Sequence, residues 1–457
     1  MALSSTHLPS PEVILVANEK TLYKVAAHIK KYAVTYLFVL ISIFFAAVSG
    51  LDKLGTSSLI NQLVLRMTRN SFIVLALIIP IIAGMGINFA ITIGAMAAQI
   101  GMLLALNWGV TGWKGILLAA GITLPLAMLF GFLIGRLLNK MKGQETIGSM
   151  ILGYFANGAY QLLFLFIFGN LIPLNSNVTI VGATGVKNTL SLMGSADLYM
   201  AVDSILRVDL LYVIYAAIAL LYLVSLVLFL KKKITHEKYL ILKTIAVVFA
   251  VVFLHKDVRA FFDGSINGTP IRIPVITWLL ITLLCVFNAV IMKTRLGQKF
   301  RAVGHNRVVA NASGINVNSV RIIAIMISTV LAGWGQILFM QSEGIGTFQT
   351  YAAHEQVGLY AGAAILVGGA SIDRATNGQA IIGTFLFHFL FITAMSAATK
   401  LFGDSAVGEY FRAFISYGII ALALVIYTWR NVASKRSSID LRRESERRSD
   451  STAKVKA

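Results

Sequence analysis

The chain alternates long apolar runs with short polar connections, many of them basic. Runs of about 20 apolar residues recur, and each is long enough to cross the roughly 30 Å hydrocarbon core of a membrane as a helix. The pattern therefore predicts an all-α polytopic membrane protein. The candidate spans are 32–50, 71–87, 91–106, 115–136, 147–170, 209–230, 239–255, 274–292, 321–341, 357–370, 380–400 and 410–429.

Two of these stretches differ from a simple crossing. The run 357–370 is short and rich in glycine, which is typical of a re-entrant element. The sequence Gly84-Met85-Gly86 separates 71–87 from 91–106, so that pair is expected to be one kinked or broken element. We therefore expect about 10–12 transmembrane helices, including a broken or re-entrant pair.

Composition supports a membrane-embedded chain. Hydrophobic residues make up 57% of it and charged residues 13%, with a mean hydropathy of +0.80. A soluble domain carries about 25% charged residues. A soluble helical protein would have to bury every one of these helices on all sides, and that reading is excluded.

The basic residues predict the orientation. Most of the 39 Lys and Arg residues fall in 1–31, 136–146, 231–243, 293–321, 371–379 and 430–457. Since connections rich in Lys and Arg stay in the cytoplasm, both termini are expected there. The expected organisation is a cytoplasmic N-terminal segment (1–31), a transmembrane domain (32–429) and a basic, disordered cytoplasmic tail (430–457). This charge lies beside an anionic membrane face, so it does not indicate nucleic-acid binding.

Ionisable side chains are scarce within the predicted spans. His388 is the clear exception, and we interpret it as a structural hydrogen-bonding residue rather than a proton relay. Neutral polar side chains are more frequent, and they suit a path for an uncharged polar solute. Interhelical hydrogen bonding is the alternative role for each of them. The predicted pathway residues are Asn88, Thr92, Gln99, Tyr154, Asn157 and Gln336.

The sequence holds no pattern of an energy-converting or catalytic site. It has no phosphate-binding G-x-x-x-x-G-K-[ST] motif, no HExxH, no C-x-x-C and no paired carboxylates within a span. The single cysteine, Cys285, excludes a disulfide framework. No catalytic residue, metal or cofactor is predicted. Transport against a concentration gradient would need an energy source in another subunit.

A short helical knob is predicted in the cytoplasmic loop 293–320. Asn306 suits a helix N-cap and Gly314 suits the position after a helix, so Arg307–Ser313 is expected to form two turns. Val308, Val309 and Ala312 would share one face. So short a helix is marginal alone and is useful when a partner's groove receives it. An ordinary basic connector is the alternative.

Three segments resemble a known family. They are 301–324 (RAVGHNRVVANASGINVNSVRIIA) with Ser328–Phe339 and Val367–Ser371, Gly84–Ala98, and Lys140–Ala156. These are similar to the permease subunits of ATP-binding-cassette (ABC) importers in the ribose, nucleoside and branched-chain amino acid group. Asn88, Gln144–Ile147 and Tyr154 look closer to the nucleoside-type members than to the sugar-type ones.

The resemblance implies a permease of ten spans in the cytoplasmic (inner) membrane of a prokaryote. It implies three partners: a cytoplasmic ATP-binding-cassette subunit, a second permease subunit that is identical or related, and an extracytoplasmic solute-binding protein. The solute would be a nucleoside or simple sugar. The residues implied to couple to the ATPase are Arg301, Gly304, Asn306, Arg307, Ala310, Gly314 and Ile315.

The chain departs from the family pattern at three places. Stretches 209–230 and 239–255 are predicted to form an inserted hairpin, 209–255. Ile372–Asn377 replaces a glycine-rich run, and Trp334 stands where a small residue is usual. The rival functions are an ion-gradient-driven secondary transporter, and an intramembrane enzyme or sensor scaffold.

Overall fold

The computed structural model describes residues 32–50, 52–141, 143–167, 171, 179–180, 189–193, 197–232, 235–266, 268–348, 352–371, 374–418, 421–422 and 425. The predicted N-terminal segment 1–31 and the predicted tail 430–457 lie outside the described residues.

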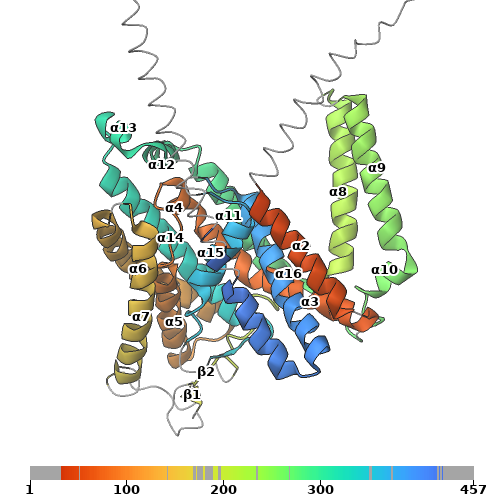
Figure 1. The fold of residues 1–457 in the computed structure, drawn as a ribbon, viewed down its shortest axis with the longest axis horizontal. Helices are drawn as coiled ribbons and strands as arrows, with labels where there is room; N and C mark the ends of the chain where they lie inside the picture. Colours follow the sequence, from red (N-terminus) through yellow and green to blue (C-terminus); the bar gives the residue numbers. More distant parts are fainter. Residues whose placement is uncertain are drawn as a thin grey trace, which may run out of the picture.

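The described chain is almost entirely helical, and its helices form one bundle with a hairpin at its side (Figure 1). The helices are α2 (Ala33–Ser49), α3 (Lys53–Ala76), α4 (Ile78–Ile82), α5 (Ile91–Asn107), α6 (Gly112–Lys140), α7 (Glu145–Ile167), α8 (Leu210–Leu230), α9 (His236–Leu254), α10 (Lys256–Ala260), α11 (Val275–Ile291), α12 (Arg295–His305), α13 (Arg307–Ala312), α14 (Val317–Gln341), α15 (Val357–Val367) and α16 (Asn377–Phe402), followed by helical residues 405–418.

Two small antiparallel sheets lie in the connections. Strands β1 (Thr179–Ile180), β2 (Thr189–Ser191) and β5 (Thr347–Phe348) form one, with Leu190 opposite Phe348. Strands β3 (Arg207–Asp209) and β4 (Arg272–Pro274) form the other, with Val208 opposite Ile273.

The predicted fold class, an all-α polytopic membrane protein with a broken pair, is confirmed. Within the described residues five helical stretches are long and apolar enough to cross a membrane, and the pair α11–α12, bent by 75°, makes a sixth if it counts as one span. The helix α15 has 11 residues, so it is shorter than the roughly 20 residues that a simple crossing needs.

The first part of the broken element is longer than the sequence pattern predicted. The span expected at 71–87 belongs to a helical stretch, 55–82, that begins far upstream. The carboxylate of Asp52 caps α3 by accepting a hydrogen bond from Gly55 N at 2.7 Å. Several polar residues of α3 contact other segments: Thr68 Oγ1 accepts a hydrogen bond from Trp278 Nε1 at 3.0 Å, and Arg69 Nη2 donates to the backbone carbonyl of Glu343. These polar residues lower the hydropathy of the first part of α3. Arg66 and Arg69 therefore lie inside a candidate span.

The helix α14 is the centre of the bundle. It packs against α6, α5 and α3, and most of its residues from Ser328 onward are buried. Ser328 Oγ donates to the carbonyl of Ala76 at 2.8 Å and so joins α14 to the end of α3. The bundle core is thus held both by apolar packing and by hydroxyl groups that satisfy backbone carbonyls.

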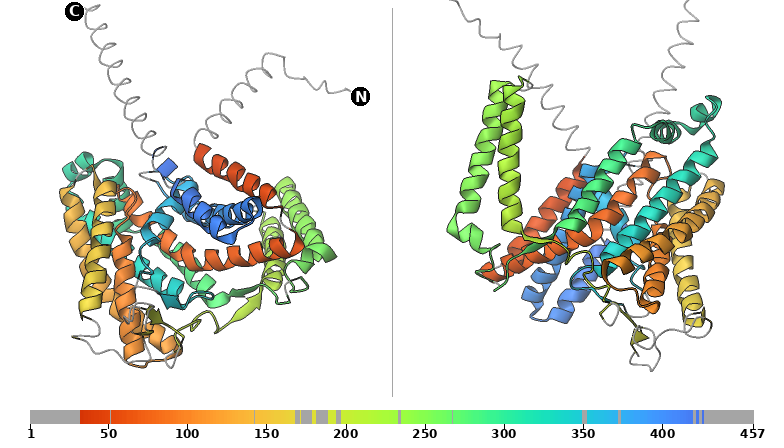
Figure 2. Two further views of the ribbon diagram at one scale, coloured as in Figure 1. Left: turned by 60° about the horizontal axis from the view of Figure 1, so that its bottom comes forward. Right: turned by 180° about the vertical axis from the view of Figure 1, so that it is seen from behind.

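The helices α8 and α9 form the hairpin that the sequence predicted, and Figures 1 and 2 show it beside the bundle rather than within it. Only 6% of the most apolar 18-residue stretch of α8 is buried. The lower end of the hairpin reaches the bundle through the segment after α10, where Ser57 Oγ donates to Phe261 O at 2.8 Å. Whether this hairpin is an insertion into the family's fold stays a prediction.

Three of the connections predicted to be cytoplasmic lie towards one end of the molecule: the one around α13, the one between α8 and α9, and the one between α6 and α7. Figure 1 shows α12, α13 and the upper ends of α8 and α9 at the top, β1 and β2 at the bottom, and α10 at the lower end of the hairpin. Glu145, at the α6–α7 connection, contacts Arg307 of α13 and therefore belongs to the same end as α13. The side of the membrane on which the termini lie stays a prediction.

Candidate functional site

The knob between α11 and α14 contains the predicted short helix. Asn306 Oδ1 accepts hydrogen bonds from Val308 N at 3.0 Å and Val309 N at 3.1 Å, which is the geometry of a helix N-cap. The helix α13 ends at Ala312, one residue earlier than expected, and Gly314 follows with φ +80°. The helix α12 differs from the sequence prediction, which places its residues in the cytoplasmic loop 293–320.

The two faces of α13 differ in their surroundings. Ala310 is 3% exposed and packs into the core, whereas Val308 is 79% exposed and Val309 is 59% exposed. Ala312 is also exposed. An apolar face of two valines and an alanine is therefore presented to the outside at the end of the bundle. We call Val308, Val309 and Ala312 the knob face.

The other side of the knob is anchored by a charged cluster. Glu145 Oε1 lies 2.7 Å from Arg307 Nη1 and 2.5 Å from Arg321 Nη2. Arg307 Nη2 also donates to the carbonyl of Gly84 at 2.6 Å. This cluster joins α13, the start of α7, the start of α14 and the broken element at one point.

Glu145 precedes the apolar run of α7, which begins at Ile147. Burial raises the pKa of the Glu145 carboxyl, but other contacts outweigh it and leave this pKa below its usual value. These contacts are hydrogen bonds from backbone N–H groups, including Gly143 N at 2.9 Å, and the charges of Arg307 and Arg321. The cluster therefore contains a stable carboxylate that holds both guanidinium groups.

The broken element lies directly under this cluster. Residues 83–90 are not helical, and Gly84 and Gly86 adopt φ +72° and +67°. The end of α12 packs at Gly304 against the backbone of Ile82–Gly84. The knob is thus in direct contact with the non-helical segment between α4 and α5.

Five of the six predicted pathway residues fall in two places. Thr92, Tyr154 and Asn157 line a very small cavity of about 10 Å³ between α5, α7 and α15. Gln99 Oε1 lies 2.7 Å from His354 Nδ1, and Gln336 Nε2 donates to Ala353 O at 3.1 Å, so these two meet at the connection before α15.

The sixth pathway residue, Asn88, lies in the non-helical segment of the broken element. It is 1% exposed, and its Oδ1 accepts a hydrogen bond from Ala90 N at 3.1 Å. Its Nδ2 is buried without a hydrogen-bond partner among the described residues. Asn88 therefore shapes the turn into α5 and holds a buried amide donor that has no partner among the described residues.

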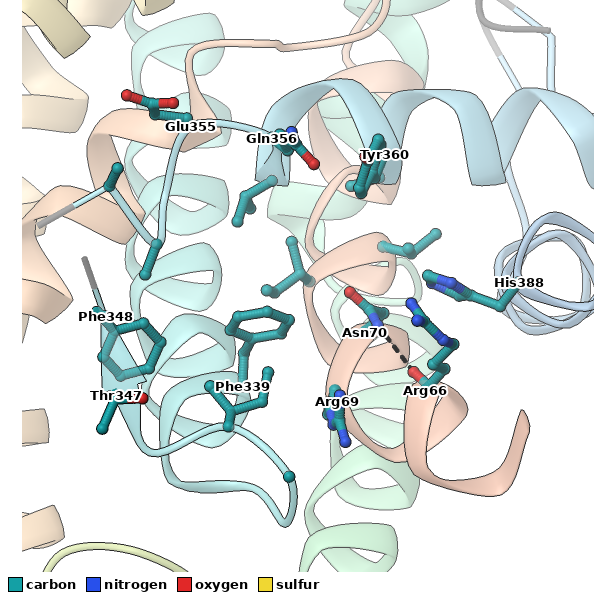
Figure 3. A pocket seen from close by; sticks show the side chains of 18 residues that line it. Arg66, Arg69, Asn70, Phe339, Thr347, Phe348, Glu355, Gln356, Tyr360 and His388 are labelled. Carbon is teal, nitrogen blue, oxygen red and sulfur yellow. Dashed lines mark hydrogen bonds between the residues drawn. The ribbon is translucent and has the colours of Figure 1, made fainter. Parts of the chain in front are cut away.

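A larger cavity of about 490 Å³ lies next to these residues (Figure 3). None of the six predicted pathway residues is among the residues that line it. Polar side chains enter it from α3, from the start of α15 and from α16, as Figure 3 shows. The polar lining residues with described side chains are Arg66, Arg69, Asn70, Thr347, Glu355, Gln356, Tyr360 and His388.

Sequence reasoning identified His388 but not the residues from α3. The predicted spans leave Arg66, Arg69 and Asn70 in the connection between 32–50 and 71–87. Their spacing, i, i+3 and i+4, places them on one face of a helix, and this spacing is the signal that could have identified them.

The cavity and the knob lie at opposite ends of α14. Val317 starts this helix just after α13, and Phe339, 22 residues later, lines the cavity. At 1.5 Å per residue the two positions are roughly 33 Å apart along the helix. The helix α14 runs without a break between the two ends and is buried along most of its length.

Comparison with known proteins identifies the family to which the chain is similar. The family described as "Branched-chain amino acid transport system / permease component" matches residues 59–424. The autoinducer 2 import system permease protein LsrC of Photorhabdus laumondii is 31% identical over 160 residues, which cover 35% of this chain and 45% of that protein. The ribose import permease protein RbsC of Escherichia coli K12 is 27% identical over 159 residues, with 35% and 47% covered.

The probable ABC transporter permease protein YphD of Escherichia coli K12 is 29% identical over 174 residues, with 37% of this chain and 50% of that protein covered. The chain thus spans about half the length of the curated relatives it matches. No solved structure matches the chain.

Proposed function

The chain belongs to the branched-chain amino acid transport system permease family, and we propose that it is the transmembrane subunit of an ATP-driven importer of a small polar solute. The ATPase is a separate ABC subunit. A second permease subunit and an extracytoplasmic solute-binding protein complete the importer, which lies in the inner membrane of a prokaryote.

The main support for the proposal is the exposed knob face on a helix that the Glu145 cluster fixes to the bundle. Val308 and Val309 are exposed, while the opposite side of α13 is fixed to the bundle by the Glu145 cluster. An exposed apolar face on a fixed short helix suits the groove of a partner protein. We assign Arg301, Gly304, Asn306, Arg307, Ala310, Gly314 and Ile315 to this ATPase-coupling region.

The contacts beneath the knob supply a mechanism for coupling. An ATPase dimer that binds the knob differently in its open and closed states shifts the permease between two conformations. Through Arg307 and Gly304, movement of the knob acts on the backbone at Gly84. The broken element then changes the opening between α5, α7 and α15, where the proposed pathway residues Thr92, Tyr154 and Asn157 meet.

The solute is proposed to be of the size of a simple sugar or nucleoside. The relatives are named for the import of ribose and autoinducer 2. The cavity of about 490 Å³ falls within the roughly 300–1,000 Å³ usual for small-molecule sites. Asn88, Thr92, Gln99, Tyr154, Asn157 and Gln336 are the proposed pathway residues.

The test is transport in liposomes that contain the full chain with its ATPase and binding protein. Uptake of the solute is expected to require ATP hydrolysis and to persist when proton and sodium gradients are collapsed with ionophores. Uptake that survives ATP removal but stops with the ionophores would instead identify a secondary transporter. An ATPase variant without its phosphate-loop lysine serves as the control.

A further inference from the structure

The large cavity carries an excess of positive charge. Arg66 and Arg69 line it, and Glu355 is the one carboxylate among its described lining residues. Glu355 is exposed, and its Oε1 accepts a hydrogen bond from Gln161 Nε2 at 2.5 Å. None of the ion pairs between described residues includes Arg66 or Arg69.

Two acidic residues, Asp203 and Glu343, lie near Arg69, but neither forms an ion pair with it. Asp203 Oδ1 accepts hydrogen bonds from Thr277 Oγ1 and Gln341 Nε2. Arg69 Nη2 donates to the backbone carbonyl of Glu343, while the Glu343 carboxylate pairs with Arg207 Nη2 at 2.5 Å. Arg69 Nε is buried without a hydrogen-bond partner among the described residues. This guanidinium group therefore has an unused donor beside the cavity.

Arg66 has an aromatic neighbour in place of an anion. Its guanidinium carbon lies 4.6 Å from the centroid of the Phe391 ring. The guanidinium carbon of Arg412 lies 4.4 Å from the same centroid, and Arg412 itself pairs with Glu409. A ring face offsets only part of the cost of desolvating a cation. The second arginine adds further positive charge next to Arg66.

His388 adds another unsatisfied polar group. It is 3% exposed, it lines the cavity, and its Nδ1 has no hydrogen-bond partner among the described residues. Figure 3 shows His388 on α16 and Tyr360 on α15 on the side of the cavity towards which Arg66 extends. Groups from three helices are thus arranged around one space.

We propose that the imported solute carries an anionic group, a carboxylate or a phosphate, which Arg66 and Arg69 bind in this cavity. Unpaired cations within a membrane-spanning helix are costly, and they are retained where an ion or substrate passes. A guanidinium group offers a planar fork of donors that matches carboxylate and phosphate oxygens. This proposal rests on the proposed function, and it replaces the uncharged solute that the sequence predicted with an anionic one.

The test measures solute binding to the purified full chain in detergent, without the ATPase. The three matched probes are ribose, ribonate and ribose 5-phosphate. Isothermal titration calorimetry measures the affinity of the protein for each of them. At least one anion is expected to bind about tenfold or more tightly than ribose, and the anion that does so distinguishes a carboxylate solute from a phosphate one. Arg66→Gln and Arg69→Gln are each expected to weaken anion binding by about tenfold or more.

Arg136→Gln is the matched control, since Arg136 is exposed on α6 over the ring of Phe132, outside the cavity. It is expected to bind the anions as the unchanged protein does. The Arg66→Lys and Arg69→Lys variants keep the positive charge, so they test the proposal even if the glutamine variants fail to fold. They are expected to prefer the anions over ribose with reduced affinity.

Equal affinity for ribose and both anions, or no anion binding, would overturn the proposal. So would full anion affinity in both the Arg66→Gln and Arg69→Gln proteins. Because no ATPase is present, these outcomes are separate from the proposed function. Uptake of ribose that depends on ATP, together with absent anion binding, would leave the importer standing and remove only the anionic solute.

Discussion

Gly84 of the broken element and Gly304 of α12 touch backbone to backbone. A Cβ atom on Gly84 would lie 2.7 Å from Gly304 Cα, and a Cβ atom on Gly304 would overlap the carbonyl oxygen of Ile82. Gly84 also adopts φ +72°, which disfavours any larger residue. These two glycines are 220 residues apart in sequence, and their contact connects the knob to the segment that precedes α5.

Replacing Gly304 by alanine is expected to separate α12 from the broken element. The added methyl group meets the Ile82 backbone, and overpacking of this kind costs about 1–3 kcal/mol. The melting temperature and ATP-dependent uptake should both fall. Gly121→Ala is the control, because nothing lies within 4 Å of a Cβ atom there. Unchanged uptake in the Gly304→Ala protein would show that this contact does not transmit coupling.

Replacing Glu145 by glutamine is expected to destabilise the knob end strongly. The substitution leaves Arg307 without its carboxylate and Arg321, which is 0% exposed, as an uncompensated buried charge. Breaking a buried pair in this way costs about 3–5 kcal/mol. Thermal unfolding of the purified protein measures the loss. The control Glu237→Gln, at an exposed position of α9, should melt like the unchanged protein.

Replacing Val308 or Val309 by aspartate is expected to weaken ATPase association without changing stability. Both side chains are exposed, so neither contributes to the core. A buried interface anchor is worth about 1–2 kcal/mol or more, which corresponds to a loss of affinity of roughly tenfold. Co-purification and titration with the ATPase measure this loss of affinity. Asn311→Asp adds the same charge at an exposed position of the same helix and should bind almost normally. ATPase binding that withstands both valine changes would refute docking through the knob face.

Replacing Asn88 by leucine is expected to impair uptake while ATPase binding is retained. The change removes the acceptor for Ala90 N and the unpartnered Nδ2 donor. An unpaired buried N–H costs about 1–3 kcal/mol, so a modest loss of stability should accompany the loss of uptake. Asn88→Asp keeps the acceptor but not the donor, and it separates the turn's contribution from a contact with solute. Normal uptake by the leucine protein would remove Asn88 from the pathway.

The local sequence pattern was sufficient to predict those features of the fold that depend on residues close together in the chain. Apolar runs predicted the helical membrane fold, and the Asn306 and Gly314 signals predicted α13 to within one residue. The Gly84–Gly86 break and the α8–α9 hairpin also follow from local composition. Each of these depends on short-range periodicity, capping or backbone freedom, which the sequence determines by itself.

Tertiary packing decided the features that join distant residues. Glu145 meets Arg321 across 176 positions, and Gly84 meets Gly304 across 220. Arg66 and Arg69 look like loop residues in a hydropathy pattern, yet the bundle places them in a helix that lines the cavity with His388. Hydropathy averages over a window and cannot distinguish a polar face turned to water from one turned to a cavity. Only the packing of α3 against α14, α15 and α16 makes that distinction.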